Sequence, residues 1–476
     1  MAVINNNKAM LDRPMWEQLS FAPATGTAGT CLENDGERYI YSYFQTSTTA
    51  AQFWRYCTWT DTWQQLATPA TQTGSVANLT FTKAVGGQYN GQVFGSVYLF
   101  VGNGTTCYWY KYDIATNTWS AALSTTNVPA AFGSDCYVCY PSVIKNNYET
   151  NYHSGYVRTI TTTSVSAAGA TTVAVSALAE ALVAGTCLRF GAYDISITSA
   201  VSKGATSIAV SGATEAMSAG TVLRLSNGLD IVLSSASLAG ATTLSVYATQ
   251  MALDTSIKIK VEKYAVLTAA AAVSATSLTV SALRVGIPSA ATAGYYGNMY
   301  LVGNNATVMY RYNIGTNAWA TTNAAGVAFP AVTGAVGTGG AVKYLPGSNL
   351  GADKLVIIRG NATSNLYTYD LVANTFATVS IQPTTETFTT GTAVAARDLG
   401  GKQNNLLISK DGTNRIYEWK PEKGIIEPKI NQWLYPSSSA VVGDRSLILT
   451  SPEGIDFFYQ LLHSSTAFVR CALIDS

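Results

Sequence analysis

Two cysteines three residues apart are the first side chains in this sequence that could bind a metal. They are Cys136 and Cys139 in the stretch CYVC, and their spacing is found in zinc and redox sites. A zinc site needs further ligands, and the chain has two histidines, His153 and His463. Because residues three apart on a strand point to opposite faces, we interpret the pair as buried free thiols, with zinc as the less favoured alternative. We therefore predict no metal site.

Carboxylates are the next candidates for chemistry. Glu33, Asp35 and Glu37 lie close together in sequence and could hold a cation through oxygen ligands, although a solvated turn is the simpler interpretation. Asp411 and Gly412 superficially resemble a sialidase Asp box, but their adjacency is typical of a two-residue hairpin turn. We find neither a nucleophile–base pair nor a phosphate-binding glycine loop. The sequence thus predicts no catalytic residues and no cofactor, so we expect that the protein is not an enzyme.

Composition narrows the classes of partner. The 476 residues are 47% hydrophobic and only 12% charged, and the formal net charge is +1. This charge gives no overall field that would attract nucleic acid. No apolar run reaches the roughly 18 residues of a membrane helix, and the first residues lack the apolar core of a signal peptide. We expect a chain without a membrane segment that is not exported by the usual route.

One aromatic pattern recurs and indicates hairpins. YKYDIATNTW (residues 110–119), YRYNIGTNAW (310–319) and LYTYDLVANTF (366–376) share alternating aromatic residues, a turn and a closing Trp or Phe. Weaker copies occur at residues 54–63 and 417–426. Alternating aromatic residues predict a strand with one buried face, and Asp, Asn and Gly favour the tight turn. Each copy is therefore predicted to be a β-hairpin.

These hairpins belong to larger units. An apolar strand and a Gly/Asn turn precede each full copy, which makes about four strands in every 50 to 57 residues. This pattern resembles kelch-like β-propellers over residues 13–150 and 291–476, although the kelch double glycine is missing. The resemblance implies an all-β fold of about six blades. We expect the strand at Trp16 to complete the C-terminal blade and close the ring. The predicted outermost strands lie at Trp16, Trp63, Trp119, Trp319, Phe376 and Ile426.

A second repeat interrupts the first. GATTVAV, GATSIAV, GATTLSV and SATSLTV begin at residues 169, 204, 240 and 274, about 35 residues apart, in a region with few aromatic residues. Each unit predicts a turn, a strand, a connector and a second strand that starts near an AGT sequence. We divide the chain into a first propeller part (residues 1–157), an inserted β-repeat region of one or two domains (158–291) and a second propeller part (292–476).

The inserted units carry a second resemblance. Between residues 160 and 285 they look like short β-units of tailed-bacteriophage structural proteins, including tail nozzle and muzzle proteins. The resemblance implies a structural component of a virion tail or neck, made in the host cytoplasm, whose partners are copies of itself and other virion proteins. We expect the insert to mediate subunit contacts. Just before the insert, Tyr148, Tyr152, His153 and Tyr156 form the candidate interface, and the alternative is that they are a hinge that packs the insert on its blade. The alternative is a propeller that binds a host glycan or receptor.

Overall fold

The structure is a computed structural model. It describes residues 16–25, 30–34, 39–47, 50–69, 76–82, 88–89, 92–93, 96–102, 106–114, 116–128, 132, 136–140, 158–179, 181–184, 186–226, 229–295, 298–323, 326–345, 354–371, 373–379, 387–389, 392–398, 404–409, 415–421, 425–431, 446–450, 456–462 and 465–473. In these ranges every regular element is a β-strand, which confirms the predicted all-β class.

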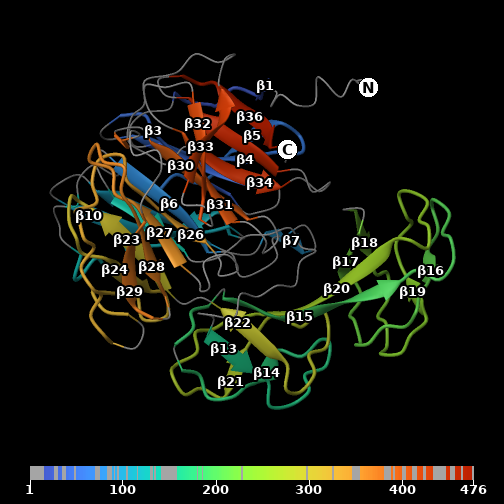
Figure 1. The fold of residues 1–476 in the computed structure, drawn as a ribbon. Helices are drawn as coiled ribbons and strands as arrows, with labels where there is room; N and C mark the ends of the chain where they lie inside the picture. Colours follow the sequence, from blue (N-terminus) through green and yellow to red (C-terminus); the bar gives the residue numbers. More distant parts are fainter. Residues whose placement is uncertain are drawn as a thin grey trace.

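Six antiparallel sheets of four strands form the main body (Figure 1). Sheet 1 contains β2 (Cys31–Asn34), β3 (Tyr39–Gln45), β4 (Ala51–Cys57) and β5 (Thr62–Gln65). Sheet 2 contains β6 (Val76–Thr82), β9 (Ser96–Gly102), β10 (Cys107–Asp113) and β11 (Thr118–Trp119). Sheet 3 contains β12 (Cys136–Cys139), β23 (Asn298–Gly303), β24 (Tyr310–Asn313) and β25 (Ala318–Ala320).

The other three sheets follow the same plan. Sheet 4 contains β26 (Ala341–Leu345), β27 (Lys354–Ile358), β28 (Leu366–Asp370) and β29 (Thr375–Val379). Sheet 5 contains β30 (Ala393–Asp398), β31 (Asn404–Ser409), β32 (Arg415–Lys420) and β33 (Ile425–Asn431). Sheet 6 contains β34 (Ser446–Thr450), β35 (Asp456–Leu461), β36 (Phe468–Leu473) and, as its fourth strand, β1 (Trp16–Gln18). A separate pair, β7 (Gln88–Tyr89) and β8 (Gln92–Val93), lies between β6 and β9 in sequence.

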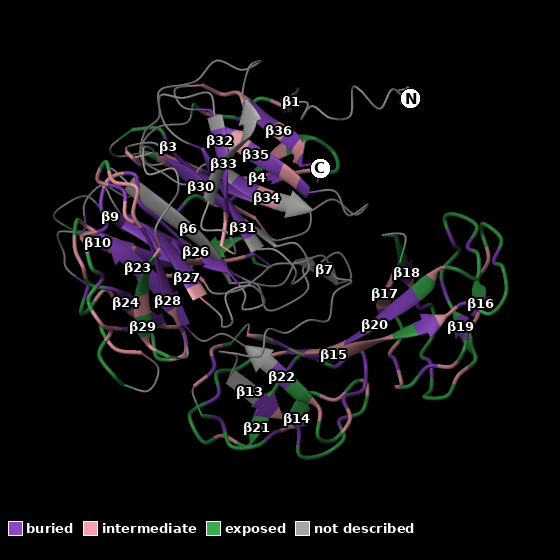
Figure 2. Ribbon diagram, in the orientation of Figure 1, coloured by how far each residue is buried: buried purple, intermediate pink, exposed green. Residues whose placement is uncertain are grey.

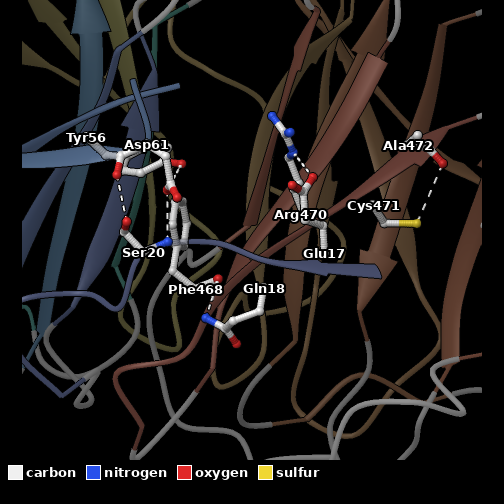
Figure 3. Close-up of polar contacts among 9 residues, drawn as sticks. All are labelled: Glu17, Gln18, Ser20, Tyr56, Asp61, Phe468, Arg470, Cys471 and Ala472. Carbon is white, nitrogen blue, oxygen red and sulfur yellow. Dashed lines mark hydrogen bonds and ion pairs between the residues drawn. The ribbon is translucent and has the colours of Figure 1, made fainter. Parts of the chain in front are cut away.

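Sheet 6 joins the two ends of the described chain, as the sequence predicted. Trp16 lies opposite Cys471, and the next residue, Glu17, forms an ion pair with Arg470 at 2.6 Å (Figure 3). Gln18 Nε2 also donates to the Phe468 carbonyl at 3.0 Å. The N-terminal strand thus supplies the edge that the three C-terminal strands lack.

The six sheets contact one another in a cycle. The first strand of each sheet contacts the first strand of the next one, and β34 of sheet 6 contacts β2 of sheet 1. A separate hydrophobic core lies between each pair of consecutive sheets. Between sheets 2 and 3, for example, Trp109 and Trp319 are almost fully buried, with ring centroids 5.4 Å apart. The strands of the main body are accordingly mostly buried in Figure 2.

A polar contact, which we call the interlock, joins neighbouring sheets at the repeated hairpin. In sheet 2, Asn117 Oδ1 accepts hydrogen bonds from the Tyr112 hydroxyl (2.7 Å) and from the backbone N–H of Ala67 (2.9 Å), which follows the last strand of sheet 1. Trp119 Nε1 donates to the carbonyl of the same Ala67 at 2.8 Å. The backbone N–H and carbonyl of Ala67 are therefore both hydrogen-bonded to side chains of the next sheet.

The same interlock recurs around the body. In sheet 3 it joins Tyr312, Asn317 and Trp319 to Ser124. In sheet 1 it joins Tyr56, Asp61 and Trp63 to Ser20, and Figure 3 shows Tyr56, Asp61 and Ser20. In sheet 4, the ring of Phe376 has no N–H to donate, and the side-chain amide of Asn374 donates instead, from Nδ2 to the Ala328 carbonyl at 3.1 Å. All four Asn or Asp residues have φ between 50° and 55°, a left-handed conformation that these two residue types tolerate well.

The insert has its own sheets. Six strands pair in the order β13 (Arg158–Thr161), β22 (Thr292–Tyr295), β15 (Cys187–Ser196), β20 (Lys258–Val266), β17 (Val222–Leu225) and β18 (Asp230–Val232). Two further pairs are β14 (Thr172–Ala174) with β21 (Ser277–Thr279), and β16 (Ser207–Ala209) with β19 (Thr243–Ser245). The sheet extends to Tyr295, past the boundary at residue 291 that the change in composition suggested.

These strands form two lobes (Figure 1). The proximal lobe comprises residues 158–190 and 264–295, the distal lobe comprises residues 192–262, and each surrounds its own hydrophobic core. The first repeat pairs with the fourth in the proximal lobe, and the second pairs with the third in the distal lobe. Strands β15 and β20 run through both lobes, with a bulge between Arg189 and Ala192. The repeats are thus nested, because outer copies enclose inner ones.

The whole insert occupies the connection between two adjacent strands of sheet 3. Cys139 on β12 lies directly opposite Tyr300 on β23, so the chain leaves and re-enters the main body at neighbouring points. The decamers at residues 110–119 and 310–319 consequently belong to consecutive sheets, and Trp109, just before the first decamer, packs in one core with Tyr312 and Trp319 of the second.

We predict that Asn117→Ala lowers the free energy of unfolding by about 2 kcal/mol. The substitution removes the acceptor of two hydrogen bonds and places alanine at a φ of 53°. Denaturant unfolding measures the loss. The matched control is Asn117→Asp, which copies Asp61 of sheet 1 and should stay within about 0.5 kcal/mol of the wild type. Equal stabilities for the two variants would contradict a structural role of this acceptor.

Candidate functional site

The CYVC cysteines lie on β12 and point to opposite faces of sheet 3. Cys136 belongs to the core between sheets 2 and 3, and Cys139 belongs to the core between sheets 3 and 4. Both are buried free thiols, as we interpreted them from the sequence. Since the two sulfur atoms face different cores, they cannot act as a pair on one ligand.

Burial suppresses the reactivity of the thiols. It raises the pKa of the Cys107 thiol above its usual range, and it raises the pKa of Cys471 to about 12. The thiolate is the nucleophilic form of cysteine, and a raised pKa keeps the proton in place near neutral pH. These side chains are therefore packing groups and not nucleophiles.

Most of the other predicted candidates fall outside the described residues. This is true of the proposed interface residues Tyr148, Tyr152, His153 and Tyr156, and equally of Asp35, Glu37, Asp411, Gly412 and His463. Glu33 is described, and it lies on β2 opposite Tyr41 of β3. Within the described ranges, no three His, Cys, Asp or Glu side chains are placed to hold a metal ion.

A glycine-rich segment, TGAVGTGG, lies at residues 333–340. Neighbouring side chains fill the space beside its glycines, so the segment is not an open loop that could bind a ligand. A Cβ at Gly334 would meet the Arg359 guanidinium at 2.7 Å, and one at Gly340 would meet the Tyr137 ring at 2.8 Å. The Tyr137 hydroxyl accepts from Gly340 N–H (3.1 Å) and donates to the Gly337 carbonyl (3.2 Å). The glycines here allow sheets 3 and 4 to approach closely.

The most distinctive surface belongs to the insert, whose turns are largely exposed in Figure 2. Among the described residues, six of the ten exposed large hydrophobic side chains lie on it: Val165, Leu229, Leu238, Tyr247, Met251 and Val273. Leu238 is 77% exposed and Tyr247 is 64% exposed, and both are on the distal lobe. The exposure of these residues was not predicted from the sequence, because Val and Leu also fill the core positions of the same repeats.

Charges on the insert pair with one another. Lys263 lies 3.7 Å from Glu215, and Arg224 lies 2.5 Å from Asp230. Lys260 and Glu262 lie 3.8 Å apart on β20, and both are buried. Because each of these positive side chains lies near a negative one, the pairs give the lobes no strong electrostatic field of one sign. Apolar contact is therefore the main interaction that the insert surface offers.

A second exposed apolar site lies on the main body, at the junction of sheets 6 and 1. There the backbone N–H of Ser20 donates to Asp61 Oδ1 at 2.8 Å, and the Ser20 hydroxyl donates to the Asp61 carbonyl at 2.6 Å. These bonds bring the segment of Phe21, which is 67% exposed, to the turn that carries Trp59, which is 48% exposed. Exposed aromatic rings beside polar groups can stack on sugar rings or insert into a protein pocket.

We predict that iodoacetamide at pH 8 modifies Cys107 and Cys471 only after unfolding, as measured by peptide mass spectrometry. Half-buried Cys57 is the internal control and should react faster in the native protein. The pKa of Cys471 is higher in the folded state than its ordinary value of 9.0, so its contribution to stability is complete below pH 9 and is lost as the pH rises toward 12. Rapid native labelling of Cys471 at pH 8 would contradict this burial.

Comparisons with known proteins leave the family open. No family model matches the chain, and no curated protein matches it. Solved structures that match include Sqt1 of Saccharomyces cerevisiae (9% identity, TM-score 0.29, 98% of this chain and 99% of that chain). An ulvan lyase matches at 8% identity and TM-score 0.30, covering 95% of each chain. The NanB sialidase of Streptococcus pneumoniae matches at 10% identity and TM-score 0.25, covering 97% of this chain and 93% of that chain. Likeness at this level carries no argument about activity.

The described part of the chain has no helix that could cross a membrane.

Proposed function

We propose that the six sheets are the blades of a closed, kelch-like six-bladed β-propeller that serves as a rigid scaffold. The cyclic contacts between first strands support this proposal, as does the pairing of β1 with β36. Joining both chain ends in one sheet leaves no open gap in such a ring. The recurrent interlock adds a polar connection between neighbouring blades.

We further propose that the protein is a structural component of a tailed-bacteriophage virion, in its tail or neck, and that the insert contacts a neighbouring subunit. The exposed apolar side chains of the insert carry this proposal. Large apolar side chains in water favour burial at an interface, by roughly 25 cal/mol for each Å² removed from solvent. The low share of charged residues, 12%, agrees with close contacts between many copies.

A double substitution on the distal lobe tests the assembly proposal. Leu238→Asn with Tyr247→Asn should weaken self-association by about tenfold per side chain, since each loses apolar burial worth about 1–2 kcal/mol. Mass photometry and analytical ultracentrifugation across a concentration series measure the oligomer. The matched control is Val327→Asn, which changes a 55% exposed apolar residue on the main body and should leave assembly unchanged. A wild-type chain that stays monomeric throughout would overturn the proposal.

Removal of the insert gives an independent test. Because Cys139 and Tyr300 lie opposite each other, a four-residue turn can replace residues 141–297 and connect β12 to β23 directly. We expect this variant to fold with the β-sheet circular dichroism of the main body and to remain monomeric. Oligomers of the same stoichiometry as the wild type would place the assembly contact on the main body.

Binding of a host glycan or receptor is the second candidate function. The exposure of Phe21 and Trp59, on two segments of the main body that the Ser20–Asp61 hydrogen bonds join, favours it. A glycan array on the full chain, repeated with Trp59→Ala, tests this candidate. Binding that the substitution abolishes would support it, and the absence of any glycan signal would count against it.

A further inference from the structure

The turn between β24 and β25 contacts the insert at a glycine. A Cβ at Gly315 would fall on the carbonyl oxygen of Ala181 in the proximal lobe, and it would lie 2.8 Å from the Ala181 carbonyl carbon. Real side-chain atoms do not approach backbone atoms this closely, so the contact exists only because residue 315 has no side chain. Here a turn of the main body and a loop of the insert touch backbone to backbone.

The chain's own repeats show that the turn itself does not need glycine. The sequences YDIATN and YNIGTN align Ala115 of sheet 2 with Gly315 of sheet 3. In sheet 2, Thr116 N–H donates to Asp113 at 3.0 Å, and in sheet 3, Thr316 N–H donates to Asn313 at 2.9 Å. Gly315 is also absent from the residues with positive φ.

The other copies indicate where a side chain at this position would go. Sheet 1 carries Trp59 there, and about half of its side chain is exposed to solvent. A side chain at this point of the turn therefore projects away from the main body. In sheet 3 the place of that side chain is taken by the insert, and this explains why this copy has glycine.

Ala181 is firmly connected to the core of the proximal lobe. Its neighbour Leu182 is 3% exposed and exchanges two backbone hydrogen bonds with Ala271, at 2.8 and 2.9 Å. A displacement at Ala181 must therefore move the lobe and not a loose loop.

The same hairpin also holds the point where the insert ends. Asn298, the first residue of β23, is buried, and its Oδ1 accepts a hydrogen bond from Arg311 of β24 at 2.9 Å. Arg311 Nε in turn donates to the Thr322 carbonyl, just after β25, at 2.8 Å. Hairpin β24–β25 thus holds the insert twice, at its exit and along its side.

We propose that Gly315 is the docking point that sets the orientation of the insert on the main body. A methyl group at this position separates the turn from Ala181 and lets the proximal lobe swing about its connections at β13 and β22. The distal lobe moves with it, because β15 and β20 run through both lobes.

The test compares Gly315→Ala and Gly315→Val in the full chain by hydrogen–deuterium exchange and by small-angle scattering of the monomer peak. We expect about tenfold faster exchange in peptides that cover residues 178–184 and 313–318. A larger radius of gyration is also expected, with a greater effect for valine. We expect both substitutions to be compatible with the turn, because other copies of the repeat have alanine (Ala115) and valine (Val372) at this position. Circular dichroism confirms that the sheets persist.

The matched control is Ala115→Gly, the reverse exchange in sheet 2, which should leave the insert peptides and the scattering unchanged. Wild-type exchange and an unchanged radius of gyration in both Gly315 variants would overturn the docking proposal. These measurements on the monomer do not depend on the proposed virion role. If the variants release the insert while oligomers form as in the wild type, docking stands and the assembly role of the insert is contradicted.

Discussion

The architecture depends on one interaction, the interlock between a turn amide or carboxylate and the backbone of the preceding sheet. Asn117 and Trp119 together satisfy the N–H and the carbonyl of Ala67, and the same pair of bonds recurs at Ser124 and Ser20. A sheet whose turn is misplaced would leave polar groups of its neighbour unpaired. The interlock therefore couples the turn geometry of sheets 1, 2 and 3 to the position of the sheet that precedes each of them.

This dependence explains how far the sequence predicts the fold. The spacing of Tyr, Asn and Trp is visible because the Tyr hydroxyl donates to the Asn side chain, while the Asn and Trp side chains bind one backbone residue of the preceding sheet. This spacing, with Asp for Asn in sheet 1 and Phe for Trp in sheet 4, located the fourth strands of sheets 1 to 4, whereas the fourth strands of sheets 5 and 6 do not carry it. The nested pairing of the insert was not predictable in this way. Four repeats of similar sequence allow neighbouring copies to pair, and tertiary packing into two cores selects the pairing of first with fourth and second with third.

The exposed apolar surface of the insert was harder to predict than the fold, for a physical reason. Leu238 is exposed and Leu244 is fully buried, although the two leucines lie only six residues apart in the repeat region. Their difference arises from the turn conformation and from the partner strand, which composition and periodicity do not encode. For the cysteines, in contrast, strand periodicity alone correctly separates Cys136 from Cys139, because the two faces of a sheet are determined by residue parity.

The location of the insert follows from the same constraint. All interlock groups lie on the third and fourth strands of a sheet, in the turn between these strands or just after the fourth strand, so the connection between the first two strands is free of them. An insertion between β12 and β23 leaves the pairing of Cys139 with Tyr300 and the bonds of Asn317 intact. Such a connection can lengthen without disturbing these contacts, and glycine at position 315 leaves room for the neighbouring hairpin to touch the insert. The main body thus tolerates a large new module because its stabilising contacts lie elsewhere in the sheet.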